Sequence, residues 1–195
     1  MPVVPLEQLD PQNKIEYRRV LVSGKFDSSH QVLLDNQVHQ TRAGYHIVTP
    51  LKIAGSDRAI LVNRGWVDGK RQRDNLPQFD TPQEQVEVTG GLKHPGGVGL
   101  KLGEHSYTKE SWPLVVQWLD IDELKTQTGY DLYPYVLRLG KQEPYGFVRE
   151  WKIVSSSPEQ STSYAVQWFT LAFVLLVIYV FVNSRKTDHG KHEYK

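Results

Sequence analysis

The stretch SYAVQWFTLAFVLLVIYVFVNSRK, residues 163–186, differs from the rest of this chain. It carries no charged residue until its last two positions, Arg185 and Lys186. Within 165–182 only Gln167 and Thr170 are plainly polar. A run of about 20 apolar residues can cross a bilayer core about 30 Å thick. A helix on the surface of a soluble domain would carry polar residues along one face. The pattern therefore predicts a transmembrane helix over 163–184.

Basic residues on either side of this run predict its orientation. The tail 185–195 holds four of them and residues 145–164 hold two, and the more basic flank normally stays in the cytoplasm. We therefore expect a cytoplasmic tail (matrix-side in a mitochondrion) and a large domain on the opposite face. MPVVPLEQLD has neither the basic nor the apolar region of a signal peptide. We therefore expect a further membrane helix before residue 1, with 1–16 as the linker that follows it.

Bulk composition excludes several classes of function. The 195 residues include 23 basic and 22 acidic ones, for a net charge of +1, whereas a nucleic-acid-binding domain is usually strongly basic. No nucleic-acid partner is expected. Cysteine is absent, which excludes disulfides, thiolate metal sites and thiol catalysis.

Residues 17–154 predict a β-rich domain, because short β-branched and aromatic runs alternate with turn signals. The predicted strands are 17–26, 30–38, 44–53, 58–67, 84–93, 113–121, 135–140 and 149–154. The second of these is expected to form a hairpin with the first. Residues 68–83 are expected to form an exposed polar loop.

One soluble helix is predicted over 120–130, between an N-cap at Asp120 and a stop at Gly129. Residues 155–162 are expected to form a hinge to the membrane helix. The predicted fold class is mainly β: an antiparallel, barrel- or sandwich-like exported domain with one short helix, plus a C-terminal transmembrane helix.

No motif of an enzyme or a metal site is present. GGVG at 96–99 lacks the Lys-Ser/Thr of a phosphate-binding loop, and no G-x-S-x-G nucleophile motif occurs. The histidines lack ligand spacing except His189 and His192, which we assign to a solvated tail. No catalytic or metal residue is therefore predicted. The alternative, a membrane-anchored periplasmic enzyme of unknown chemistry, would need titratable side chains that gather only in the folded domain.

The stretch VNRGWV, 62–67, places Asn63 and Arg64 in an otherwise buried-looking strand, just before Gly65. Glycine permits a bulge or a close backbone approach, and the guanidinium offers a planar fork of donors. Two interpretations stay open: a recognition patch, or a buried arginine that braces the end of a barrel.

Three stretches in this order, GYHIVTPL at 44–51, ILVNRGWV at 60–67 and YAVQWFTLA at 164–172, resemble the Surfeit locus protein one family. Its members help to assemble cytochrome c oxidase, a haem–copper terminal oxidase. The resemblance implies a non-enzymatic assembly factor whose partners are oxidase subunits or other oxidase-biogenesis proteins. It also implies the bacterial inner membrane, with a periplasmic domain, or the mitochondrial inner membrane.

The resemblance also implies site residues. The family motifs fall on Gly44, Tyr45, His46, Asn63, Arg64, Gly65, Trp66, Tyr164, Ala165, Gln167, Trp168 and Phe169. Haem a is the candidate cofactor, and bacterial relatives place an axial histidine three residues before the Tyr-Ala pair. Here that position is Ser161, and serine is not a usual haem ligand. A haem-binding form of this chain would need another ligand, such as His46 or Tyr164.

Overall fold

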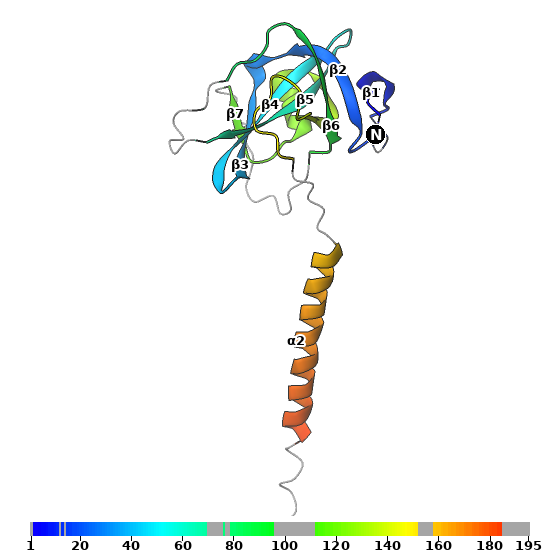
Figure 1. The fold of residues 1–195 in the computed structure, drawn as a ribbon, viewed down its shortest axis with the longest axis vertical. Coiled ribbons are helices and arrows are strands. Elements are labelled where there is room, and N and C mark those ends of the chain that lie inside the picture. The colour runs from blue at the N-terminus through cyan, green and yellow to red at the C-terminus, as the bar shows by residue number, and fades with distance from the viewer. Residues whose placement is uncertain are drawn as a thin grey trace, which may run out of the picture. The chain divides into compact units, whose positions relative to one another are not determined.

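The computed structural model divides into two compact units, Met1–Glu150 and Trp151–Lys195, each of which is described by itself (Figure 1). The described residues are 2–11, 13, 15–69, 76, 79–95, 112–151 and 158–184, and the side chains of 158–164 are outside this set. The segment 96–99 and both tail histidines therefore lie outside the described residues.

The first unit is built mainly of strands. They are β1 (Val4–Pro5), β2 (Arg19–Phe26), β3 (Val32–His39), β4 (Arg42–Ile53), β5 (Arg58–Asp68), β6 (Gln85–Lys93), β7 (Leu114–Val116) and β8 (Asp131–Leu139). Two 3-10 turns, Leu6–Gln8 and Ser28–His30, and the helix α1 (Ile121–Thr128) complete the unit, and α2 (Pro158–Ser184) forms the second. The predicted fold class is confirmed: a mainly β domain with one short helix, followed by an apolar C-terminal helix.

The strands form one sheet in the order β1-β2-β6-β8-β5-β4-β3-β7. A further pairing of β2 with β4, through Phe26 with Leu51 and its two neighbouring pairs, bends the sheet back on itself. The result is sandwich-like. Most pairings are antiparallel, as expected, but β1–β2, β3–β7 and β5–β8 are parallel. Sequence periodicity gives no signal for such long-range pairings.

Two strand predictions are wrong. The first two predicted strands do not form a hairpin, because β2 pairs with β6 and β4 while β3 pairs with β4 and β7. β3 instead forms a hairpin with β4, which turns at Gln40 and Thr41 with φ of 44° and 67°. The predicted strand 149–154 is absent from its described residues 149–151. Val148 instead makes an isolated bridge to Trp66.

The position of β5 between two hydrophobic clusters explains why its sequence is an almost unbroken apolar run. Its residues alternate between two hydrophobic clusters: Ile60 and Val62 face one, and Ala59 and Leu61 face the other. A strand covered on both faces loses the usual alternation of polar and apolar residues. Asn63 and Arg64 continue this strand and are also buried.

The helix α1 confirms the predicted caps. The Asp120 side chain accepts hydrogen bonds from the backbone N–H groups of Asp122 and Glu123. Gly129 has a φ of 72°, and its N–H donates to the Lys125 carbonyl at 2.8 Å. Leu124 is the buried anchor of the helix.

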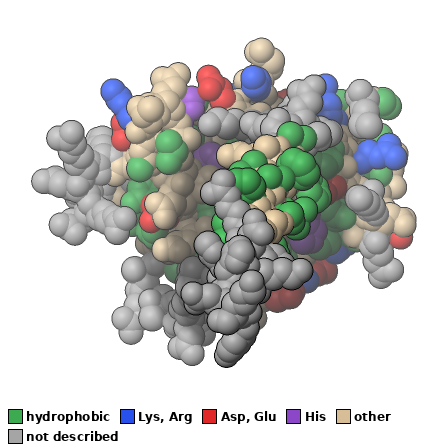
Figure 2. All heavy atoms as spheres, turned by 90° about the horizontal axis from the view of Figure 1, so that it is seen from below, with side chains coloured by type: hydrophobic (Ala, Val, Ile, Leu, Met, Phe, Trp, Pro, Cys, Tyr) green, Lys and Arg blue, Asp and Glu red, His purple; other side chains and the backbone are tan. Residues whose placement is uncertain are grey.

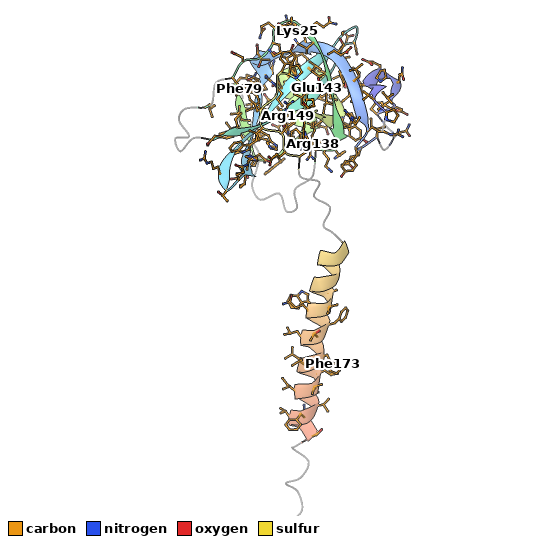
Figure 3. The ribbon with its side chains drawn as sticks, viewed as in Figure 1. Lys25, Phe79, Arg138, Glu143, Arg149 and Phe173 are labelled. Atoms are coloured by element: carbon orange, nitrogen blue, oxygen red, sulfur yellow. The ribbon has the colours of Figure 1, made fainter. Side chains whose placement is uncertain are left out.

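The helix α2 contains the segment Ala165–Ser184, which is long and apolar enough to cross a membrane and is the one such segment among the described residues. Its large side chains, such as Phe173, point outward from the ribbon (Figure 3). On the face shown in Figure 2, basic and acidic side chains lie interspersed.

Candidate functional site

Two of the three sequence motifs meet in the fold. β4 and β5 pair in antiparallel fashion, so that Tyr45 lies opposite Val67 and His46 lies opposite Trp66. The register then shifts, and Val48 lies opposite Asn63. Gly65, with a φ of 113°, occupies this bulge. Residues 44–46 and 63–66 are therefore neighbours, whereas the third motif belongs to α2 in the other unit.

Gly65 lets another part of the chain cross β5 closely. We call residues 140–150 the crossing segment. Its Phe147 N–H donates to the Arg64 carbonyl at 2.7 Å, and Val148 exchanges hydrogen bonds of 2.7 and 3.1 Å with the backbone of Trp66. A Cβ at Gly65 would lie 2.7 Å from the Val148 carbonyl oxygen. Only glycine fits this close approach at this φ.

Among the described residues, Arg64 is the largest fully buried side chain, at 1% exposure. Its Nε donates to the Tyr145 carbonyl at 2.7 Å, one terminal nitrogen donates to Thr81 Oγ1 at 2.8 Å, and the other donates to the Asp80 carbonyl at 2.8 Å. The guanidinium also lies 5.1 Å from the Phe147 ring centre. Burial lowers the pKa of Arg64 to about 10, so it stays charged at neutral pH. Arg64 on β5 thus braces two other segments, residues 80–81 and the crossing segment.

Sequence reasoning missed the partners in this brace. Residues 68–83 were expected to form an exposed loop, yet Thr81 is half-buried and binds both Arg64 and Gln31, at 2.8 and 2.6 Å. Phe79 packs by ring edge on Phe147 at 5.7 Å. Leu76 and Phe79, two large apolar residues within a polar, charged loop, were the available signals, and both pack on the cluster of Leu33, Tyr45 and Ile47.

A second arginine holds the crossing segment in its own shape. Arg149 donates through one terminal nitrogen to the carbonyls of Gly140 and Glu143, at 2.5 and 2.8 Å, and through Nε to the Phe147 carbonyl at 3.2 Å. Figure 3 shows Arg149 and Glu143 near each other in the domain. Gly146 lies against the Arg149 guanidinium, where a Cβ would collide with it. Arg149 carried no sequence signal.

Asn63 fixes the state of His46. Asn63 Oδ1 accepts from the Gly65 N–H at 3.1 Å, which turns its Nδ2 toward His46 Nδ1 at 3.2 Å. His46 Nδ1 is then an acceptor, and the ring proton sits on Nε2. Burial, and secondarily the charge of Arg138, lower the pKa of His46 to about 4. His46 is therefore neutral at physiological pH.

The remaining motif residues of the domain pack its interior. Trp66 Nε1 donates to the Gln37 carbonyl at 2.8 Å, and its ring lies 5.1 Å from that of His39. Gly44 lies against this indole. Tyr45 is 5% exposed and packs with Leu33 and Ile47.

The motif residues of α2 lie outside the domain. Ser161 and Tyr164 are in the helix, but their side chains are not among those described. Trp168 and Phe169 are 70% and 77% exposed, and Gln167 and Ala165 are exposed as well. Thr170 Oγ1 donates to the Val166 carbonyl at 2.8 Å, so this hydroxyl is satisfied within the helix.

These residues do not fit haem ligation at the family position. Ser161 supplies only a hydroxyl. His46 Nδ1 accepts from Asn63, and Nε2 carries the proton, so neither nitrogen offers a lone pair to iron in this arrangement. No group of three His, Asp or Glu side chains among the described residues could hold a metal ion. No chemical step is assigned to haem here.

Comparisons with known proteins agree with the motifs. A sequence model of the SURF1 family matches residues 1–173. The chain is 26% identical over 190 residues to a SURF1-like protein of Rickettsia conorii, covering 94% of this chain and 75% of that protein. It is 27% identical over 144 residues to Surfeit locus protein 1 of Rattus norvegicus, covering 66% of this chain and 45% of that protein. The family match spans the whole first unit and about half of the second, and the chain belongs to the SURF1 family.

Proposed function

We propose that this protein is a membrane-anchored assembly factor for a haem–copper terminal oxidase and acts in the biogenesis of cytochrome c oxidase. Membership of the SURF1 family is the observation that carries the proposal, because the match includes both the braced β-domain and most of α2. The partners would be oxidase subunits or other oxidase-biogenesis proteins.

The proposed mode of action is protein contact. The domain presents a crossing segment fixed by Arg64 and Arg149, so its surface there is preorganised for a partner. The side chains of Ala165–Ser184 are exposed and apolar, which suits packing against the helices of a membrane client. Gln167 adds a polar group that can form a hydrogen bond across a helix pair.

The proposed location is the bacterial inner membrane, with the domain in the periplasm and the tail in the cytoplasm, or the mitochondrial inner membrane in a eukaryote. In this arrangement 17–154 is the exported domain, 155–162 the hinge and 163–184 the span. The excess of basic residues in 185–195 supports this orientation. We propose no catalytic step and no haem ligation at Ser161.

Genetic complementation tests this proposal. Cells that lack the gene should lose most terminal oxidase activity in isolated membranes, while growth by other respiratory routes continues. The wild-type gene should restore the activity, and oxidase subunits should co-purify with the protein. Unchanged oxidase activity in the deletion strain would contradict the proposal.

A visible absorption spectrum distinguishes action through protein contacts from action through bound haem. The protein purified from cells that make haem a is expected to show no Soret band. A band in the natural protein would show that haem is bound through another ligand. A band only in a Ser161→His variant would indicate a haem site that lacks its ligand, which agrees with action through protein contacts.

A further inference from the structure

An open hollow of about 380 Å³ lies where residues 80–84 meet the crossing segment. Its lining includes two exposed acidic residues, Asp80 and Glu84. Neither carboxylate has a hydrogen-bond or ion-pair partner among the described residues. The hollow therefore presents two negative charges that no described cation pairs with.

Arg64 also lines the hollow, but its guanidinium is engaged within the protein. The side chain is 1% exposed, and its nitrogens donate to the carbonyls of Tyr145 and Asp80 and to the Thr81 hydroxyl. Arg149, the other arginine of the crossing segment, is not part of the lining. Two exposed carboxylates thus outweigh one buried guanidinium, so the hollow is negative where a partner would meet it.

Pro82, Tyr145 and Phe147 give the same hollow an apolar, aromatic wall. Tyr145 is 38% exposed, and the bond from Arg64 to its carbonyl fixes the backbone that carries the ring. An aromatic face attracts a cation that lies over it, and the aliphatic stem of a lysine or arginine packs well on apolar surface. The lining therefore suits a side chain that is apolar along its length and positive at its end.

We propose that this hollow binds a basic segment of a partner protein. An arginine of that segment pairs with Asp80 and Glu84, while its stem and its neighbouring residues pack on Pro82 and Tyr145. A guanidinium carries five donors in a planar fork, so one arginine can serve two carboxylates. Arginine is also enriched at protein interfaces.

Two other cationic occupants fit the hollow less well. A metal ion is disfavoured, because no group of three His, Asp or Glu side chains among the described residues could hold one. A small free cation is disfavoured as well, because small-molecule sites enclose most of the ligand surface and this hollow is open. A protein segment gains from the apolar wall, which its neighbouring residues cover.

The fixed crossing segment also supports the proposed action through protein contacts, so the two tests need separate readouts. Binding of a basic segment is measured on the purified protein with peptides of defined sequence and does not depend on oxidase assembly. A negative binding result would leave the genetic proposal intact, and unchanged oxidase activity in a deletion strain would leave the binding site intact.

The test uses nuclear magnetic resonance of the full-length protein in detergent micelles, at low and constant ionic strength. Tyr145 and Gly146 form the single Tyr-Gly pair of the chain. Labelling with ¹³C-carbonyl tyrosine and ¹⁵N-glycine therefore gives one assigned amide signal, that of Gly146, which lines the hollow. The probes are the peptide acetyl-Phe-Arg-amide, its neutral isostere acetyl-Phe-citrulline-amide, and butylguanidinium. We expect the arginine peptide to bind about fivefold more tightly than the citrulline peptide, because only the former makes ion pairs.

Asp80→Asn and Glu84→Gln should keep the fold, because both side chains are exposed. Each substitution should weaken binding of the arginine peptide by about two- to threefold. The double variant should bind the arginine and citrulline peptides equally. Glu87→Gln is the matched control: Glu87 is also exposed but does not line the hollow, and no change is expected.

Equal binding of the two peptides by the natural protein, or an unchanged preference in the double variant, would overturn the proposal. Butylguanidinium binding as tightly as the arginine peptide would overturn the assignment to a protein segment. Added salt should reduce the preference for the arginine peptide, because exposed charges are screened. A preference that salt leaves unchanged would show that the two carboxylates are not its source.

Discussion

Gly44 lies against the indole ring of Trp66 on the neighbouring strand, so that a Cβ at Gly44 would lie 2.6 Å from Trp66 Nε1 and collide with the Val67 carbonyl. This contact joins the two domain motifs. The missing side chain on β4 lets the indole lie flat enough to donate to the Gln37 carbonyl on β3. A glycine and a tryptophan that are 22 positions apart in sequence therefore form one structural unit.

Gly44→Ala should destabilise the domain by roughly 1–3 kcal/mol, because the added methyl group overlaps both the indole and a backbone carbonyl. Urea unfolding followed by tryptophan fluorescence measures this loss. Gly91→Ala is the control, since a Cβ there meets nothing within 4 Å. Equal effects of the two substitutions would show that the contact with Trp66 is unimportant.

Gly65→Ala should cost roughly 2–4 kcal/mol, because it combines an unfavourable φ of 113° with a Cβ 2.7 Å from the Val148 carbonyl. Limited proteolysis should cut the variant within 140–150 much faster than the wild type. Gly55→Ala isolates the strain of positive φ, because φ there is 73° and the space is open. It should cost roughly 1 kcal/mol without new cleavage. Similar cleavage in both variants would contradict a close approach at Gly65.

Arg64→Gln should lower the free energy of unfolding by roughly 2–4 kcal/mol, because the shorter amide cannot reach Tyr145, Asp80 and Thr81 together and leaves some of these acceptors unsatisfied. Arg42→Gln is the matched control. Its side chain is 74% exposed, and its one ion pair, from a terminal nitrogen to an Asp68 carboxylate oxygen, is long at 3.5 Å. The free energy of unfolding should therefore change by no more than about 0.5 kcal/mol. Circular dichroism during urea titration compares the two. A loss below about 1 kcal/mol for Arg64→Gln would argue against a brace.

Local patterns in the sequence were enough to predict most of the strands. β2 and β6 alternate between buried and exposed residues, and α1 has an acidic N-cap and a glycine stop. Each of these patterns depends only on residues that are close together in the sequence, so a short window is enough to recognise it. The pairing of β2 with β6 and the parallel pairing of β5 with β8 join distant segments, and no short pattern encodes them.

The candidate site was only partly predictable for the same reason. Arg64 and Gly65 stood out because they interrupt a buried strand. Their partners at Asp80, Thr81 and Tyr145 lie in segments without regular periodicity, and two of these contacts are made by backbone carbonyls, which every residue carries. Composition therefore could not distinguish these loop residues from others.

His46 should make the domain less stable as pH falls from about 6.5 to about 4. Its pKa is lowered in the folded state to about 4 by burial and by Arg138, whereas an unfolded histidine titrates near 6.5. Between these values the unfolded chain binds the proton and the folded domain does not, so protonation favours unfolding. Urea unfolding at several pH values should show stability rising from pH 4 to 6.5. His46→Gln should flatten that rise.

Arg138 provides a second test of the same prediction. Arg138→Gln removes the cation that opposes protonation of His46, so the pKa of His46 should move up toward 6.5 and the rise should shrink without disappearing. Desolvation is the larger cause of the shift, which is why this variant should retain most of the rise and His46→Gln should not. If His46→Gln keeps the full rise between pH 4 and 6.5, another group titrates in this range, and the half-buried neutral imidazole bonded to Asn63 is not its source.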